Sequence, residues 1–275
     1  MRKAITAITF FDMVFLLVLS ISGSIGGVAG NIVYYFAFII PGFLAVLYFK
    51  SAGNEEIKPT LLKLLPDRKT ILSTLPLVAP FIGIVFLVSF LTSLLLNAFG
   101  FSDTTDVSGN IVSVVIRHAV IPAFLEEALF RFIPIMLLVS YSKKNALVIP
   151  SLMFAFVHCN LFQIPYALIA GFILSFIAIG TGSIFPCILI HFVNNVASIV
   201  FMRYAGVGNF NLIFFSVLAL LIAVSIAVII LQRRKYKEFI TEIKADKSNV
   251  EFTSPVLLFT AMTLVMGVAG LWMKL

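Results

Sequence analysis

Nine long apolar runs constrain this chain more than any other feature of its sequence. Each comes close to the roughly 20 apolar residues that a helix needs to cross a bilayer. They cover approximately residues 5–22, 28–49, 71–99, 111–139, 146–163, 164–180, 183–204, 210–231 and 254–272. We therefore predict an all-α polytopic bundle with eight or nine transmembrane spans, which forms a single membrane domain over residues 1–275.

The composition excludes a soluble protein. Hydrophobic residues make up 61% of the chain and charged residues only 11%. A soluble domain has about half apolar and about a quarter charged residues. Too few charges are present to cover a water-facing surface, so lipid must be the solvent for most of the chain.

The net charge of +7 follows membrane topology. With nine spans and a cytoplasmic N-terminus, 15 of the 19 Lys and Arg residues fall in cytoplasmic segments, namely the N-terminus, residues 50–70, residues 143–144 and residues 232–253. The opposite loops hold only Arg203 and Lys274. This bias is the positive-inside rule. It predicts a multi-pass protein of the cell membrane with its N-terminus in the cytoplasm, and no nucleic-acid partner.

Residues 232–253 form a basic stretch with an amphipathic pattern. Such a stretch suits the surface of an anionic leaflet. A solvated connector is an equally good interpretation of the same residues, and the pattern leaves both open.

Ionisable residues inside the spans are the candidates for function, because each costs at least about 2.5–3.5 kcal/mol to insert into lipid. The embedded set is small. The embedded acids and histidines are Asp12, Glu126, Glu127, His158 and His191.

The first motif joins two adjacent glutamates to an arginine. Glu127 and Arg131 are four residues apart, so on a helix they share a face and can form an ion pair. Glu126 points elsewhere and has no such partner. A buried structural pair would explain Glu127 and Arg131, but it leaves Glu126 unexplained.

Two further motifs lie on later spans. Phe154 precedes His158 by one helical turn, and His191 precedes Asn195 by the same spacing. Each motif alone is weak, because polar residues also join membrane helices structurally. At about 1.5 Å per residue, Glu126 lies about 21 Å from the cytoplasmic end of its span, His158 about 18 Å, and His191 and Asn195 about 12–18 Å. These depths overlap, which predicts one site.

The chemistry of this set suits hydrolysis of a peptide bond. A glutamate in apolar surroundings is a competent general base for water, and a nearby histidine can share the proton or orient the water. A second histidine and an asparagine amide can donate hydrogen bonds to the developing oxyanion. The expected substrate is therefore a membrane-bound protein or peptide.

The three motifs together resemble the CPBP family, the CAAX prenyl protease and bacteriocin-processing membrane proteins also called Abi proteins. The family pattern is E-E-x-x-x-R, F-x-x-x-H and H-x-x-x-N, in that order, and the protease-like core covers about residues 111–204. The resemblance implies an intramembrane endopeptidase, of a kind that suits a bacterium. It implies catalytic roles for Glu126, His158, His191 and Asn195, with Glu127 and Arg131 shaping the site.

The chain departs from the family at Phe132, where many members have glycine. Close helix packing at that position is therefore in question.

Metal dependence is left open by the motifs. The family is often labelled metalloprotease, and Glu126, His158 and His191 would be the ligands of one zinc ion. The chain contains no H-E-x-x-H signature, and neutral asparagine is a poor zinc ligand but a good oxyanion donor. We favour a site without a cofactor.

Two other functions fit parts of the sequence. A non-catalytic immunity or scaffold protein would bind a membrane partner and would not need the motif residues. A transporter would use Glu126, His158 and His191 as a proton relay, but it would be expected to show an internal repeat, and none is visible in the sequence.

Overall fold

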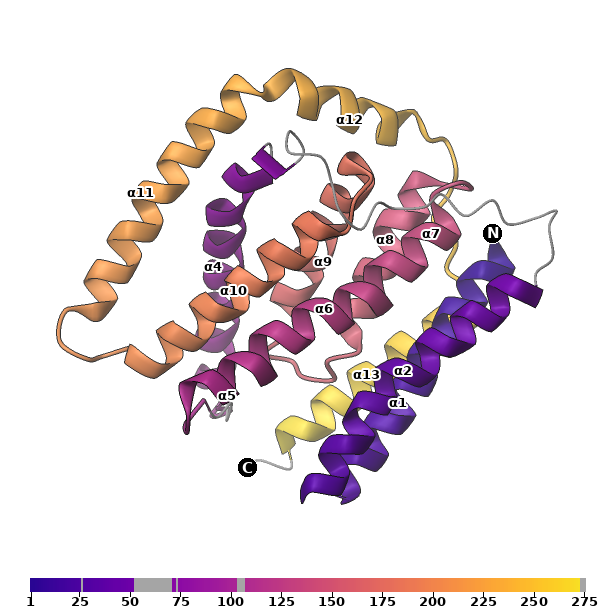
Figure 1. Cartoon of the computed structure of the whole chain (residues 1–275), viewed down its shortest axis with the longest axis horizontal. Coiled ribbons are helices and arrows are strands. Elements are labelled where there is room, and N and C mark those ends of the chain that lie inside the picture. The colour runs from indigo at the N-terminus through magenta and orange to yellow at the C-terminus, as the bar shows by residue number, and fades with distance from the viewer. Residues whose placement is uncertain (26, 52–70, 73, 103–106, 273–275) are drawn as a thin grey trace.

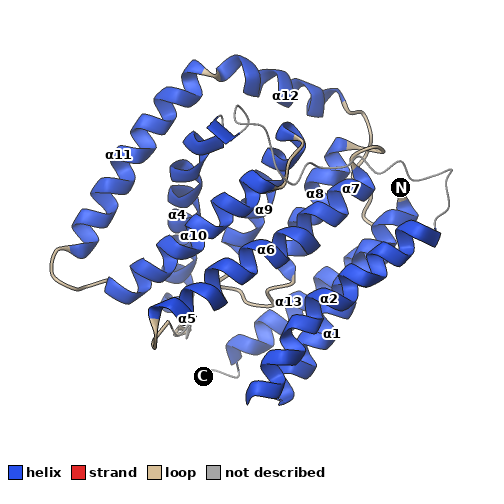
Figure 2. Ribbon diagram, viewed as in Figure 1, coloured by secondary structure: helices blue, strands red, loops and turns tan. Residues whose placement is uncertain are grey.

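The computed structural model describes residues 1–25, 27–51, 71–72, 74–102 and 107–272, and every regular element in this part is helical (Figures 1 and 2). The elements are α1 (Arg2–Ile25), α2 (Gly27–Ser51), η1 (Leu75–Leu77), α4 (Val78–Ala98), α5 (Ile111–Val115), η2 (Ile116–Val120), α6 (Ile121–Glu127), η3 (Ala128–Phe132), α7 (Ile133–Leu138), α8 (Lys143–Phe156), α9 (Ile164–Thr181), α10 (Phe185–Tyr204), α11 (Phe210–Leu231), α12 (Arg233–Ala245) and α13 (Ser254–Trp272).

The predicted all-α polytopic bundle is confirmed. Each of the nine apolar runs contains helix. In the described part, five helices are long and apolar enough to cross a membrane, namely Arg2–Ile25, Leu75–Ala98, Ile164–Thr181, Phe185–Tyr204 and Phe210–Leu231. Shorter apolar helices lie at Ile32–Ala45 and Ser254–Gly270.

The predicted span 146–163 is wrong at its end, because α8 stops at Phe156. Cys159 takes a left-handed conformation with φ of 48°, which no regular helix accommodates. The side chain of Asn160 then accepts a hydrogen bond from the backbone N–H of Phe162 at 2.9 Å, which forms a turn. Apolar composition alone cannot reveal such a break.

The predicted span 111–139 is a helix interrupted by two π-turns, η2 and η3. Each π-turn ends just before a proline, Pro122 in the first turn of α6 and Pro134 in the first turn of α7. A proline has no N–H to donate and clashes with the preceding turn of an α-helix. The wider π-turn accommodates this residue, and such turns are frequent at functional sites.

The helices pack around two apolar clusters. The first joins α1, α2 and α13 to α7, α8 and the N-terminal part of α9. The second joins α4, α6, α7, α9 and α10. In Figure 1, α1, α2 and α13 lie together on one flank, and α11 runs along the opposite edge, with Ser225 its one buried residue. The helices that carry the three motifs lie between these flanks.

Helices α8 and α9 approach closely at Gly171. A Cβ atom on Gly171 would lie 2.9 Å from Cα of Ser151, which is closer than real contacts allow. Ser151 also donates a hydrogen bond from its hydroxyl to Ser175, at 3.4 Å. A residue with no side chain therefore sets the spacing of the two helices.

Basic segments that are distant in sequence meet at one end of the bundle. Arg2 in α1 pairs with Glu251, and Lys143 in α8 pairs with Glu242 in α12. Figure 1 shows α12 crossing this end of the bundle, with the N-terminus nearby and the C-terminus at the far end. The basic stretch predicted at 232–253 is therefore helical over most of its length, while its contact with lipid stays a prediction.

Asp246 links the start of α8 to the segment after α12 through hydrogen bonds. Its carboxylate accepts hydrogen bonds from the Ser142 hydroxyl at 2.8 Å and from the Lys144 backbone N–H at 3.1 Å. Partial burial raises the pKa of Asp246, but hydrogen bonds from Ser248, Lys144 and Ser142 outweigh that effect and hold the pKa below its ordinary value.

Candidate active site

One cavity of about 420 Å³ brings the three motifs together. Glu126 of α6, His158 after α8, and His191 and Asn195 of α10 all line it. These residues come from three separate segments, so the fold places them around one space. The catalytic roles of these four residues stay predictions.

Glu127 and Arg131 form an ion pair that is completely buried beside this cavity. Nη1 of Arg131 lies 2.8 Å from Oε1 of Glu127, and neither side chain is exposed to solvent. The same Oε1 accepts a second bond, at 2.7 Å, from Nδ1 of His191. Glu127 therefore fixes both an arginine on its own helix and a histidine on α10.

The contact with Glu127 determines the state of the His191 ring. Because an ionised carboxylate only accepts hydrogen bonds, Nδ1 of His191 carries the proton. Its Nε2 faces the other glutamate and lies 3.9 Å from Oε2 of Glu126. When the ring is doubly protonated, Nε2 is a hydrogen-bond donor at the cavity.

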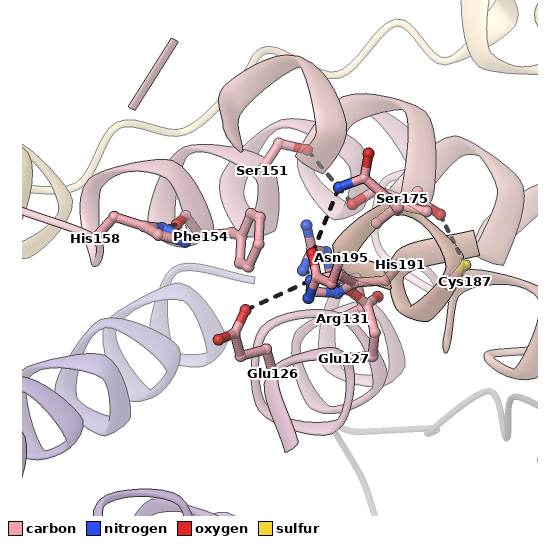
Figure 3. A network of polar contacts seen from close by, with 12 residues as sticks. Glu126, Glu127, Arg131, Ser151, Phe154, His158, Ser175, Cys187, His191 and Asn195 are labelled. Carbon is pink, nitrogen blue, oxygen red and sulfur yellow. Dashed lines mark hydrogen bonds and ion pairs between the residues drawn. The ribbon is translucent and has the colours of Figure 1, made fainter. Parts of the chain in front are cut away.

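The two adjacent glutamates have different surroundings. Figure 3 shows their side chains leaving the helix in different directions. Glu127 is enclosed by its two partners, whereas Glu126 lines the cavity with 19% of its side chain exposed. Only Glu126 is therefore placed to contact a ligand or a water molecule in the cavity.

His158 is held by the backbone of its own segment. Its Nδ1 lies 2.7 Å from the carbonyl oxygen of Phe154. A carbonyl oxygen only accepts, so Nδ1 donates and Nε2 of the neutral ring is left as an acceptor. That acceptor suits the proton of a water molecule.

Phe154 connects the two histidines and the arginine. Its ring meets the rings of His158 and His191 edge-on, at centroid distances of 4.9 and 6.1 Å. The guanidinium carbon of Arg131 lies 3.5 Å from the centre of the same ring, a cation–π contact. Figure 3 shows Phe154 between His158 and Arg131.

Asn194 is a cavity residue that the motifs did not predict. The residue is 7% exposed, and its Nδ2 donates to Oδ1 of Asn195 at 3.4 Å. That bond leaves Nδ2 of Asn195 as the donor available to the cavity. Oδ1 of Asn194 is buried and has no hydrogen-bond partner among the described residues, and Asn194 lines the cavity. In the sequence, Asn194 follows His191 by three residues, and this helical spacing could have identified it as a cavity residue.

Other cavity residues come from outside the motifs. Tyr34 and Tyr35 of α2 form part of the wall, as do Gln163 and Tyr166 near the start of α9. Arg117 in η2 lines the cavity as well, although its sequence position indicates a membrane interface. Nothing in the sequence links α2 to the motif helices, because their approach depends on tertiary packing.

The candidate zinc ligands do not come together in this arrangement. Over the described residues, no group of three or more His, Cys, Asp or Glu side chains is placed to hold a metal ion. Glu126 and His191 approach each other, whereas His158 does not join them in such a group. The side chains as they stand do not fit a zinc site.

One comparison with known proteins gives a match over part of the chain. Residues 107–197 match the family model described as type II CAAX prenyl endopeptidase Rce1-like. A search of curated proteins and a search of solved structures gave no match. The matched segment runs from just before α5 into α10 and contains all three motifs. The membrane-embedded core at residues 107–197 is therefore similar to the Rce1-like type II CAAX prenyl endopeptidases, which confirms the family resemblance predicted from the motifs.

Proposed function

We propose that this protein is an intramembrane endopeptidase of the CAAX-protease type, which cleaves a peptide bond in a membrane-bound protein or peptide. The observation that carries the proposal is the shared cavity: a glutamate, two histidines and an asparagine from three segments line one space. The match of residues 107–197 to Rce1-like endopeptidases supports the same activity.

In the proposed reaction Glu126 is the general base. It takes a proton from a water molecule, and the resulting hydroxide attacks the carbonyl carbon of the scissile bond. His158 orients that water, because its Nε2 is free to accept a hydrogen bond while Nδ1 is held by the Phe154 carbonyl. Glu126 then returns the proton to the amine that leaves as the C–N bond breaks. No step passes through a metal ion.

His191 and Asn195 stabilise the oxyanion that forms on the carbonyl oxygen. Asn195 offers Nδ2, since its Oδ1 is engaged by Asn194. His191 offers Nε2 of the protonated ring, whose Nδ1 donates to the carboxylate of Glu127. Donors that are fixed before the reaction stabilise such a transition state most effectively.

Mass spectrometry of membrane peptides tests this proposal and names a substrate. Cells with the wild-type protein are compared with cells that carry Glu126→Gln or, as a control, Glu238→Gln on the exposed surface of α12. We expect cleavage products to disappear with Glu126→Gln, to persist with Glu238→Gln, and the amount of protein to stay the same. A Glu126→Gln protein that produces the same peptides at the normal rate contradicts the proposal.

A further inference from the structure

The cavity has a charged side chain of each sign. Among its described lining residues, Glu126 is the one acid and Arg117 the one arginine or lysine. Arg117 is exposed and forms no hydrogen bond or ion pair with the residues that the structure describes. A guanidinium at the cavity wall, without a partner among the described residues, is available to a ligand.

The π-turn η2 explains how Arg117 reaches the same cavity as Glu126. In a regular α-helix, residues nine positions apart lie on opposite faces. A π-turn holds an additional residue, and so it removes about 100° of that offset. The backbone N–H of Ile121 bonds to the carbonyl of Ile116, which closes the turn that contains Arg117. The local distortion therefore turns Arg117 towards the face that carries Glu126.

The separation of the two charges suits an extended peptide. Nine helical residues span about 13 Å along the axis. An extended chain rises about 3.3 Å per residue, so about four peptide residues would connect the two positions. A peptide bond at Glu126 would then place a group about four residues away beside Arg117.

We propose that Arg117 is a specificity-determining residue that binds a carboxylate of the substrate, about four residues from the bond that is cleaved. A planar guanidinium pairs with a carboxylate through two parallel hydrogen bonds, which gives direction as well as attraction. The carboxylate belongs either to the end of the substrate chain or to an aspartate or glutamate side chain. This inference rests on the proposed function, because it assigns a subsite to the same cavity.

Matched peptides and variants test the inference on the full-length protein in lipid nanodiscs. The starting peptide is one that the wild-type protein cleaves. One pair carries a C-terminal carboxylate or a C-terminal amide four residues beyond the cleaved bond. A second, longer pair carries Asp or Asn at that position. The proteins are wild type, Arg117→Gln, Arg117→Lys and the control Arg233→Gln, which changes an exposed arginine on α12.

We expect the wild type and Arg233→Gln to prefer the carboxylate peptide in one of the two pairs by about tenfold in KM, the effect of one hydrogen-bonded charge pair. Arg117→Gln should remove the preference with little change in kcat, and Arg117→Lys should retain part of it. The pair that responds identifies the source of the carboxylate.

Two outcomes overturn the inference. Either the wild type cleaves acid and neutral peptides equally in both pairs, or Arg117→Gln keeps the preference of the wild type. The wild-type comparison stands even when an Arg117 variant fails to fold. Loss of the proposed function itself gives a different result, in which Glu126→Gln cleaves the starting peptide normally.

Discussion

At the residue scale, Glu127 is a structural centre with two partners. One oxygen atom accepts hydrogen bonds from both Arg131 and His191, and no part of Glu127 or Arg131 is exposed. Nε and Nη2 of Arg131 have no hydrogen-bond partner within the described part of the chain. Arg131 therefore depends on Glu127 for its one carboxylate contact and on Phe154 for its cation–π contact.

We predict that Glu127→Gln lowers the free energy of unfolding by about 3–5 kcal/mol, because it leaves the buried charge of Arg131 without its carboxylate. Protein accumulation and thermal stability in detergent measure this effect. The adjacent Glu126→Gln is the matched control and should leave both near the wild-type values, since Glu126 lines the cavity. Equal stability of the two variants would contradict the structural role of Glu127.

The residues of the motifs could be singled out from sequence because charged groups in lipid are rare and costly. Glu126, His158 and His191 stand out for that reason, and Asn195 follows from its spacing to His191. Asn194, Tyr34 and Tyr35 do not stand out, because amides and tyrosines are common in membrane helices. Their place in the cavity depends on how α2 and α10 pack against α6, which a local pattern does not encode.

At the element scale, hydropathy located the helices but not their irregularities. It gave the run 146–163 as one span, although Cys159 ends the helix through its left-handed backbone. It also gave the run 111–139 as one span, in which the structure has the π-turns η2 and η3. Both irregularities lie next to site residues, where backbone geometry determines which way the side chains point.

The α8–α9 contact gives a prediction at this scale. Gly171→Ala introduces a Cβ that meets the backbone of Ser151, so the two helices must separate. We expect a loss of about 1–3 kcal/mol in unfolding free energy, the typical cost of overpacking. Activity should fall as well, because Ala170 and Leu174 beside Gly171 line the cavity.

Gly42→Ala is the matched control for that variant. Gly42 lies inside α2, and a Cβ there would meet no atom within 4 Å. Alanine favours a helix over glycine by up to about 1 kcal/mol, so this variant should be as stable as the wild type or slightly more stable. Thermal unfolding of both proteins in the same detergent makes the comparison. If Gly171→Ala is also as stable as the wild type, close packing does not set the helix spacing.

At the scale of the whole molecule, the charges separate by end. Arg2, Lys143 and α12 come together at one end of the bundle through the ion pairs with Glu251 and Glu242. The turn between α10 and α11 lies at the other end, with Arg203 as the nearest basic residue on α10 (Figure 1). Contacts in the structure thus gather three of the four segments that the charge bias had assigned to one side. The fourth, residues 50–70, lies outside the described residues from position 52 onward.

This arrangement predicts which end faces the cytoplasm. The end with α12 carries the basic excess, so the positive-inside rule places it in the cytoplasm. Lys247 follows α12 and Asn209 precedes α11, and both are exposed. We expect Asn209→Cys to react with a membrane-impermeant thiol reagent in intact cells, and Lys247→Cys to react only after the membrane is opened. The wild-type protein, with Cys187 buried and Cys159 partly buried, provides the background. If Lys247→Cys reacts in intact cells and Asn209→Cys reacts only after the membrane is opened, the bundle is inserted the other way. Glu126 would then be approached from the opposite face.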